Sequence, residues 1–155
     1  MQTQQELYIK KIEDGTVIDH ITPGFALDVL KILKIDGKGG EVVSAAINVE
    51  SKQLQHKDIV KIQKRELQPS EVDKIALIAP NATINIVRNF AVTSKKVVEL
   101  PSTIRGIIKC DNPSCISNSN EPVESQFAVD RSEPIRLHCH YCGHIMERED
   151  ILGRF

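Results

Sequence analysis

The hydrophobic positions of the first hundred residues follow two patterns. Apolar positions at helical spacing predict helices over residues 25–33 and 69–78. Short runs rich in β-branched residues indicate strands. These runs cover residues 7–12, 16–21, 41–49, 58–63, 82–87 and 95–100. Thr22 followed by Pro23 is the expected start of the first helix, and Pro69 that of the second.

The order of these elements predicts the fold class. Without the first strand, the order is β-α-β-β-α-β, which is typical of a ferredoxin-like antiparallel sandwich with both helices on one face of the sheet. We therefore predict an α+β fold, βαββαβ with an extra N-terminal strand, for residues 1–100. Another α+β order stays open, because one sequence does not show which strands are neighbours.

The pattern changes at Pro101. Helical periodicity ends there, and turn residues cluster at 112–114 and 117–120. We interpret residues 102–105 as a linker and residues 101–155 as a small all-β domain. A segment this short, with few large apolar side chains, needs a cross-link to fold stably.

Composition excludes several classes of protein. The 155 residues are 41% hydrophobic and 26% charged, as in ordinary globular proteins, and no apolar run approaches the roughly 20 residues of a membrane span. A net charge of −1 and an aromatic content of 4% argue against a nucleic-acid binder. No secretory signal is evident at the N-terminus, so we expect a cytoplasmic protein with no membrane partner.

The four cysteines supply the cross-link. Cys110 and Cys115 form a C-x4-C pair, Cys139 and Cys142 form a C-x2-C pair, and the spacer has room for a hairpin of residues 124–129 and 135–138. Two such pairs present four thiolates to one tetrahedral zinc ion. Two disulfides are the alternative, which the missing signal and the C-terminal clustering of the cysteines disfavour.

Three histidines lie near the cysteines, and each is an alternative nitrogen ligand. With four cysteines already at suitable spacing, we expect His138, His140 and His144 to be exposed neighbours. A full set of thiolates leaves zinc no open position, so the metal is expected to fold the domain and to perform no reaction.

Motifs from both halves of the chain occur together in one order. They are GTVIDHI at 15–21, KDIVKI at 57–62, APNATIN at 79–85, EPV at 121–123, FAV at 127–129 and the two cysteine pairs. Together they closely resemble the regulatory chain of aspartate carbamoyltransferase over nearly the whole sequence.

The resemblance implies a non-catalytic subunit that controls pyrimidine biosynthesis. Its N-terminal allosteric domain would bind nucleotides and pair with a second regulatory chain, and its zinc domain would dock on the catalytic chain. In that family, three regulatory dimers join two catalytic trimers, and CTP typically opposes the reaction while ATP favours it.

The resemblance also implies which residues contact the nucleotide. They are Ile12, Asp19, His20, Lys57, Lys61, Asn85 and Lys95. Their chemistry fits, because Lys57 and Lys61 share one side of a strand and supply cations for phosphates, while Asp19 suits a ribose hydroxyl. Without the resemblance, the lysines would be interpreted as solvated edge charges. We interpret Val17 and Ile59 as core residues.

Two questions stay open. A zinc-ribbon accessory factor that binds nucleic acid is the alternative function, because pairs of cysteines with this spacing are common in that class of protein. The loop between His20 and Phe25 is shorter than in the regulatory chains of enteric bacteria, so the nucleotide preference is open as well. Ile116, Ile145 and Met146 are candidates for exposed contacts with the catalytic chain.

Overall fold

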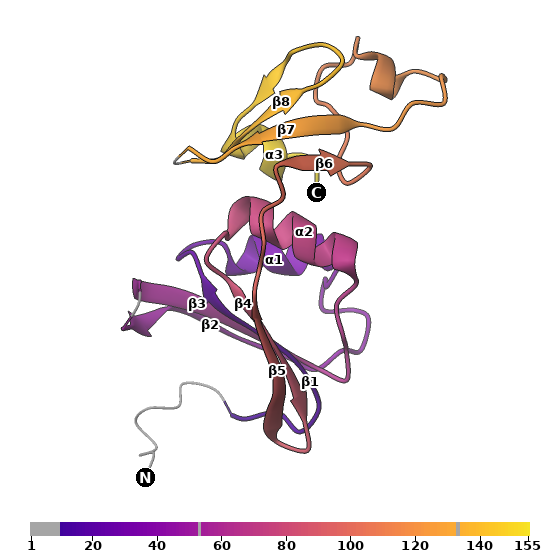
Figure 1. Ribbon diagram of the computed structural model, residues 1–155. Coiled ribbons are helices and arrows are strands. Elements are labelled where there is room, and N and C mark those ends of the chain that lie inside the picture. Colours follow the sequence, from indigo (N-terminus) through magenta and orange to yellow (C-terminus); the bar gives the residue numbers. More distant parts are fainter. Residues whose placement is uncertain (1–9, 53, 133) are drawn as a thin grey trace. The chain divides into compact units, whose positions relative to one another are not determined.

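The computed structural model describes residues 10–52, 54–132 and 134–155 (Figure 1). The chain divides into two compact units between Val98 and Glu99, and each unit contains its own antiparallel sheet. Among the described residues, no helix has both the length and the apolar character that crossing a membrane requires.

The first unit is a five-stranded sheet with two helices on one face (Figure 1). Its elements are β1 (Gly15–Ile21), α1 (Ala26–Ile32), β2 (Val43–Ser51), β3 (Gln55–Gln63), α2 (Pro69–Ile78), β4 (Thr83–Arg88) and β5 (Ala91–Val97). The strand order is β2-β3-β1-β4-β5, with every neighbouring pair antiparallel. The predicted β-α-β-β-α-β order is confirmed, and β5 adds a strand beside β4.

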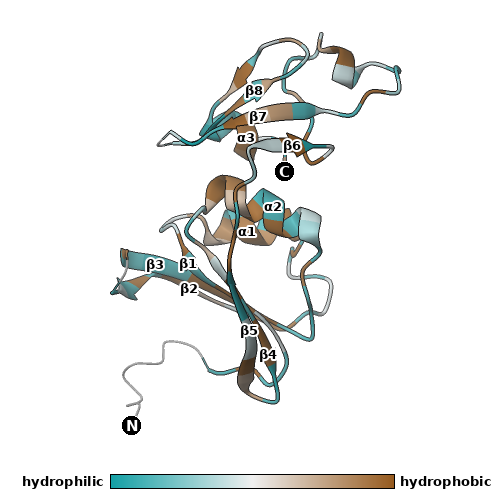
Figure 2. Ribbon diagram, viewed as in Figure 1, coloured by the Kyte–Doolittle hydropathy of each residue, from teal (hydrophilic) through white to brown (hydrophobic). Residues whose placement is uncertain are grey.

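The two faces of this sheet differ in burial. Ile18 of β1 and Val60 of β3 are fully buried, while their neighbours Val17 and Asp19 are half-buried. Since successive strand residues point to opposite faces, the fully buried set lies under the helices. Both helices carry hydrophobic and hydrophilic residues along their length (Figure 2), as expected for amphipathic helices that cover a sheet. The face without helices is therefore the one available for ligands.

The two helices begin in different ways. Pro69 starts α2 as predicted, and Gln68 and Glu71 form a capping box before it. The predicted start of α1 at Thr22 and Pro23 is wrong, because α1 begins at Ala26. Its first amide is bound by the carboxylate of Asp58, which lies 32 positions away in the chain. A long-range cap of this kind has no local sequence signal.

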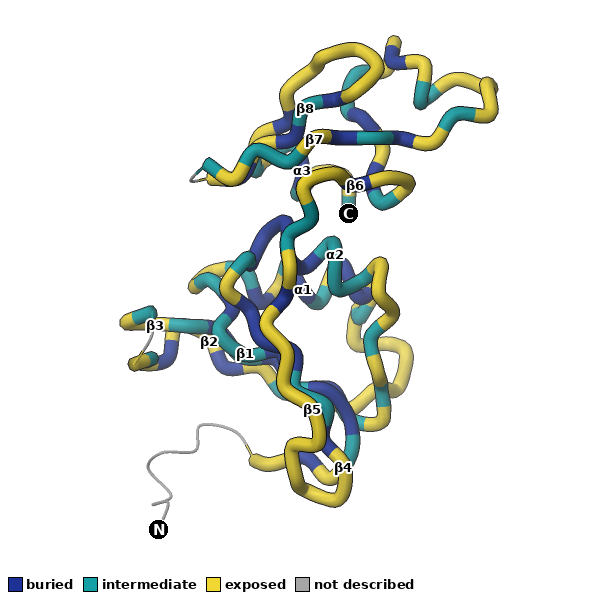
Figure 3. Tube along the Cα trace, in the orientation of Figure 1, coloured by how far each residue is buried: buried dark blue, intermediate teal, exposed yellow. Residues whose placement is uncertain are grey.

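The terminal strands of the first unit also differ from the expected bounds. Of the strand expected over residues 7–12, residues 7–9 lie outside the described residues, and residues 10–12 are not in a strand. The strand expected over 95–100 runs from Ala91 to Val97 and is exposed along its whole length (Figure 3). It begins early because Asn89 and Phe90 both adopt positive φ (51° and 65°), which makes a tight hairpin turn with β4.

The second unit is a four-stranded sheet with one short helix. Its elements are β6 (Thr103–Arg105), a 3-10 turn (Ile116–Asn118), β7 (Gln126–Asp130), β8 (Arg136–Cys139), β9 (Ile145–Met146) and α3 (Arg148–Leu152). The sheet order is β6-β7-β8-β9, and β7 with β8 is the predicted hairpin. The interpretation of residues 102–105 as a linker is wrong, because Thr103–Arg105 pairs with β7 and buries Ile104.

Candidate functional site

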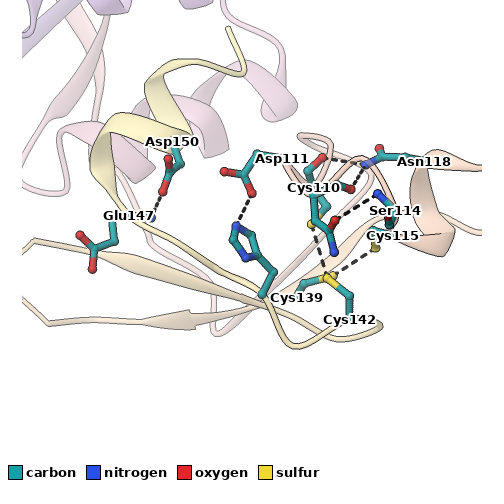
Figure 4. A network of polar contacts seen from close by, with 11 residues as sticks. Cys110, Asp111, Ser114, Cys115, Asn118, Cys139, Cys142, Glu147 and Asp150 are labelled. Atoms are coloured by element: carbon teal, nitrogen blue, oxygen red, sulfur yellow. Dashed lines mark hydrogen bonds and ion pairs between the residues drawn. The ribbon is translucent and has the colours of Figure 1, made fainter.

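Four sulfur atoms meet at one end of the second unit (Figure 4). The Sγ atoms of Cys110, Cys115, Cys139 and Cys142 all lie within 4.8 Å of one another. The Cys110–Cys142 separation is 3.7 Å and the Cys115–Cys139 separation is 3.6 Å. A tetrahedron of zinc–sulfur bonds has sulfur–sulfur edges of about 3.8 Å, whereas a disulfide bond is about 2 Å long. The donor set therefore fits one structural zinc ion.

Each cysteine pair is shaped by a turn. In the first pair, the Asn112 carbonyl accepts the N–H of Cys115 at 3.0 Å, and the Asn112 side chain accepts the N–H of Ser114. In the second pair, Cys139 ends β8, and the N–H of Gly143 donates to its carbonyl at 3.0 Å. Gly143 has φ of 72°, a conformation that glycine adopts without strain.

The pKa values of the cysteine thiols differ within the cluster. Burial raises the pKa of Cys110 to about 12, and burial also raises the pKa of Cys139. Cys142 is exposed, and hydrogen bonds from the Asn112 side chain and the His144 backbone lower its pKa to about 6. A metal ion binds the thiolate forms, so metal binding would release the protons of the buried thiols.

Neighbouring polar groups hold the first turn in place. The side-chain amide of Asn118 donates to the carbonyl oxygens of Cys110 and Asn112, both at 2.8 Å. Outer contacts of this kind orient metal ligands. The sequence showed no signal for this role of Asn118.

The nearby histidines face carboxylates. His144 Nε2 lies 2.7 Å from Asp111 Oδ1, and His138 Nε2 lies 3.6 Å from Asp130 Oδ2. Both side chains are more than two-fifths exposed, and His140 is exposed as well. The metal-binding cluster of the described residues consists of the four cysteines, as predicted.

The residues expected to contact a nucleotide share the helix-free face of the first sheet. Lys61, Val17, Asn85 and Lys95 stand in one register row across β3, β1, β4 and β5. The row places a cation at each end and an amide near the middle. Such a row can bind an extended anion along the sheet.

A cavity of about 280 Å³ opens on this face. Ile12, Asp19, Lys61 and Asn85 line it, as do Lys11, Val17, Ile59, Val87, Phe90 and Val92. The interpretation of Val17 and Ile59 as core residues is therefore wrong, since helices cover only the other face of the sheet. The cavity has an apolar floor and a charged edge, which suits a planar ring joined to an anionic group.

The remaining predicted contacts, His20, Lys57 and Lys95, flank the cavity. Lys57 Nζ lies 2.9 Å from Asp19 Oδ1, and His20 Nδ1 lies 3.1 Å from Thr83 Oγ1. Burial lowers the pKa of His20, Asp19 opposes this shift, and the charges of Lys57 and Lys95 add to it. The charges of Lys57 and Lys95 therefore disfavour protonation of His20 in the free protein.

Two polar groups that line the cavity, Lys61 and Asn85, have unusual surroundings. The Nζ atom of Lys61 donates a hydrogen bond to the Lys10 carbonyl at 3.1 Å. Burial lowers the pKa of Lys61, and the positive charge of Lys11 adds to that shift, while Asp19 opposes it. Within the described residues, Asn85 Oδ1 is buried and has no hydrogen-bond partner. A buried polar atom without a partner is uncommon and often marks a functional site.

Phe90 is a cavity residue that the sequence analysis did not single out. Its φ of 65° is unusual for a bulky side chain, and its N–H donates to the Glu13 carbonyl at 2.9 Å. Strained residues cluster at functional sites. The sequence signal was weak, since Asn89-Phe90 is not a typical turn pair.

Exposed apolar side chains also occur on the second unit. Ile116 and Ile145 are exposed as expected, and Tyr141 joins them. Met146 is fully buried, so its selection as an exposed contact is wrong. It follows Ile145 in β9, where alternation sends the two side chains to opposite faces.

Comparisons with known proteins cover both units. The family model for the aspartate carbamoyltransferase regulatory chain, allosteric domain, matches residues 7–99, and the model for its metal binding domain matches residues 102–152. A curated relative from Korarchaeum cryptofilum is 53% identical over 150 residues, which cover 96% of each chain. One from Methanothermobacter thermautotrophicus is 51% identical over 155 residues, or 100% of this chain and 99% of the relative. Both relatives are named aspartate carbamoyltransferase regulatory chain.

Proposed function

The chain belongs to the family of aspartate carbamoyltransferase regulatory chains, and from this premise we propose that it binds nucleoside triphosphates on its first unit and the catalytic chain through its second. It is a regulatory subunit, as its relatives are, and not the catalyst. The proposed ligands are of the CTP and ATP type, and the proposed location is the cytoplasm.

The observation that carries the nucleotide proposal is the helix-free face of the first sheet. Lys57, Lys61 and Lys95 are suited to bind phosphate oxygens, and Asp19 a ribose hydroxyl. The cavity floor, which includes Ile12 and Val17, suits the base. His20 and Asn85 would add polar contacts near the ribose or the phosphates.

The four-cysteine cluster supports the proposal for the second unit. Cys110, Cys115, Cys139 and Cys142 would hold the zinc ion, which would join the two turns of a domain with a small core. The folded domain would then dock on the catalytic chain, with Ile116 and Ile145 as candidate contacts. By family resemblance, two regulatory chains would pair, and three such dimers would join two catalytic trimers.

Regulation in this proposal is a matter of linkage. A nucleotide that binds two quaternary states with unequal affinity shifts the equilibrium between them. A coupling of about 1–3 kcal/mol between sites is typical and changes the equilibrium constant between the two states about 5- to 150-fold. The regulatory chain needs no reactive group for this task.

Co-purification with the catalytic chain tests the proposal, followed by activity assays with CTP and ATP. We expect a stable complex whose activity changes with at least one of the two nucleotides. A complex that responds to neither would contradict the nucleotide proposal. Absence of a complex would contradict the docking proposal, and nucleic-acid binding that weakens steeply with salt would favour the zinc-ribbon alternative.

A further inference from the structure

We propose that Asp58 is a positioning residue for the nucleotide-binding face, because it holds the backbone that presents His20 and Lys57. Asp58 lies in β3 and is fully buried, so it touches no nucleotide itself. The assignment of a binding role to this face rests on the proposed function, whereas the positioning of His20 can be measured without any ligand.

Asp58 binds three backbone amides from two different parts of the chain. Its Oδ2 accepts the N–H groups of Gly24 and Ala26, both at 3.0 Å. Its Oδ1 accepts the N–H of Asn48 at 2.8 Å. Three amide donors stabilise a buried carboxylate, because each of these hydrogen bonds is charge-assisted. Asp58 thus ties the loop before α1 to the neighbouring strand β2.

The strands that pair with β3 on either side of Asp58, β1 and β2, both have irregular pairing close to it. The pairing of β3 with β1 shifts register between Ile18 and Ile21, and its pairing with β2 shifts between Ala46 and Val49. Each irregular stretch contains a residue with positive φ, His20 at 56° and Asn48 at 58°. Histidine and asparagine adopt that conformation more readily than most residues, and contacts from the surrounding chain help to hold it. Asp58 supplies such contacts to Asn48 directly and to the segment that follows His20.

The same short stretch determines the positions of Lys57 and His20 on the nucleotide face. Lys57 precedes Asp58, and strand alternation directs its side chain to the helix-free face, where it pairs with Asp19. His20 lies in the irregular stretch of β1 that the loop to Gly24 continues. Loss of the carboxylate would release both backbone segments and move both side chains away from the phosphate positions.

The test compares the Asp58→Asn variant with the wild-type chain. Asparagine keeps the volume but has one acceptor oxygen, and its NH2 group would face an amide donor. Ligand-free NMR titration is expected to show the pKa of His20 rising toward its ordinary value as the ring loses its buried position. Calorimetry with CTP or ATP is expected to show about tenfold weaker binding, the loss that one charge-assisted hydrogen bond produces.

Thr16→Val is the matched control. The Thr16 hydroxyl is buried on the same sheet and donates to the Arg65 carbonyl, but Thr16 lies away from both irregular stretches. This variant should lose stability while the pKa of His20 and nucleotide affinity stay as in the wild type. If Asp58→Asn does not fold in water, the same titration is repeated in concentrated sucrose, which favours the folded state. The pKa of His20 should then shift in the same direction.

The outcomes separate the two proposals. An unchanged pKa of His20 in folded Asp58→Asn, measured in water or in sucrose, would overturn the positioning role of Asp58. A wild-type chain that binds neither nucleotide would overturn the proposed function, and the pKa of His20 would still decide the role of Asp58.

Discussion

The sulfur atoms of Cys110 and Cys142 lie 3.7 Å apart, although 32 positions separate the two residues in the chain. The first pair of cysteines belongs to a loop and the second to the end of β8. Their meeting closes the second unit around a metal-sized space. The stability of this unit should therefore depend on the metal.

Zinc removal is expected to unfold the second unit and leave the first unit folded. Structural zinc contributes about 10–16 kcal/mol in small domains, more than a core of this size supplies. Chelation, or the Cys139→Ala substitution, should release the chain from its catalytic partner, as size-exclusion chromatography would show. His140→Ala is the control, because His140 is an exposed neighbour and the variant should keep its zinc. Assembly that survives complete zinc removal would contradict the role of the second unit.

Asn118→Ala is expected to weaken zinc binding by about tenfold to a hundredfold. The substitution removes the two hydrogen bonds that the Asn118 side chain donates to the turn between Cys110 and Cys115, and outer contacts of metal ligands typically have effects of this size. Competition with a chromogenic chelator measures the affinity. Asn120→Ala, an exposed change in the same loop, should leave it unaltered. Equal affinities in the two variants would show that the turn forms without Asn118.

Much of the fold was predictable because its signals are local. The helix period and Pro69 predicted α2, and the spacing of the cysteines indicated the metal centre. Beyond Pro101 such signals fade, and the edge strand β6 has only three residues. Short strands of this kind owe their existence to pairing with a neighbour rather than to their own sequence.

The parts that could not be predicted depend on long-range contacts. In the sequence, Asp58 is an ordinary polar residue at the start of a predicted strand. Only the folded chain brings the amides of Gly24, Ala26 and Asn48 to its carboxylate. Phe90 enters the cavity through a turn that its sequence does not favour. The seven predicted nucleotide contacts were grouped by resemblance, and they stay a prediction.

Lys61→Ala and Lys95→Ala are expected to weaken triphosphate binding by about tenfold to a hundredfold and nucleoside binding much less. The reason is that both ammonium groups are assigned to phosphates, where charge-assisted hydrogen bonds are strong. Calorimetry with CTP and cytidine, or ATP and adenosine, gives the two affinities. Lys96→Ala is the matched control, since Lys96 is next in β5 and lines a groove on the helix side. Equal losses for both ligands would show that the phosphate assignment is wrong.

The contribution of His20 to triphosphate affinity is expected to rise as the pH falls through and below 6.5. Burial lowers the pKa of His20 from its ordinary 6.5, so the ring is neutral at pH 7 in the free protein. A bound triphosphate favours the protonated ring and raises its pKa, so binding takes up a proton between the bound and the free pKa values. Calorimetry in buffers of different ionisation enthalpy measures this uptake.

The His20→Gln variant is the control for that titration. A triphosphate itself gains a proton near pH 6, which reduces its charge and weakens binding, so its own titration has the opposite sign. Subtracting the proton uptake measured for His20→Gln from that of the wild type gives the contribution of the imidazole. Identical proton uptake in the variant and the wild type would show that His20 does not contact the phosphates.

Asn85→Val is expected to raise the stability of the first unit while it weakens nucleotide binding. Asn85 Oδ1 is buried without a hydrogen-bond partner among the described residues, a situation that costs about 1–3 kcal/mol. Valine removes the oxygen and suits a strand, so the free energy of unfolding in urea should rise by about 1 kcal/mol. CTP and ATP affinity should fall, because the oxygen would accept a hydrogen bond from the ligand. Asn81→Ala, at an exposed site before β4, should change neither quantity. A variant that binds nucleotide as well as the wild type would mean that the oxygen accepts no hydrogen bond from the ligand.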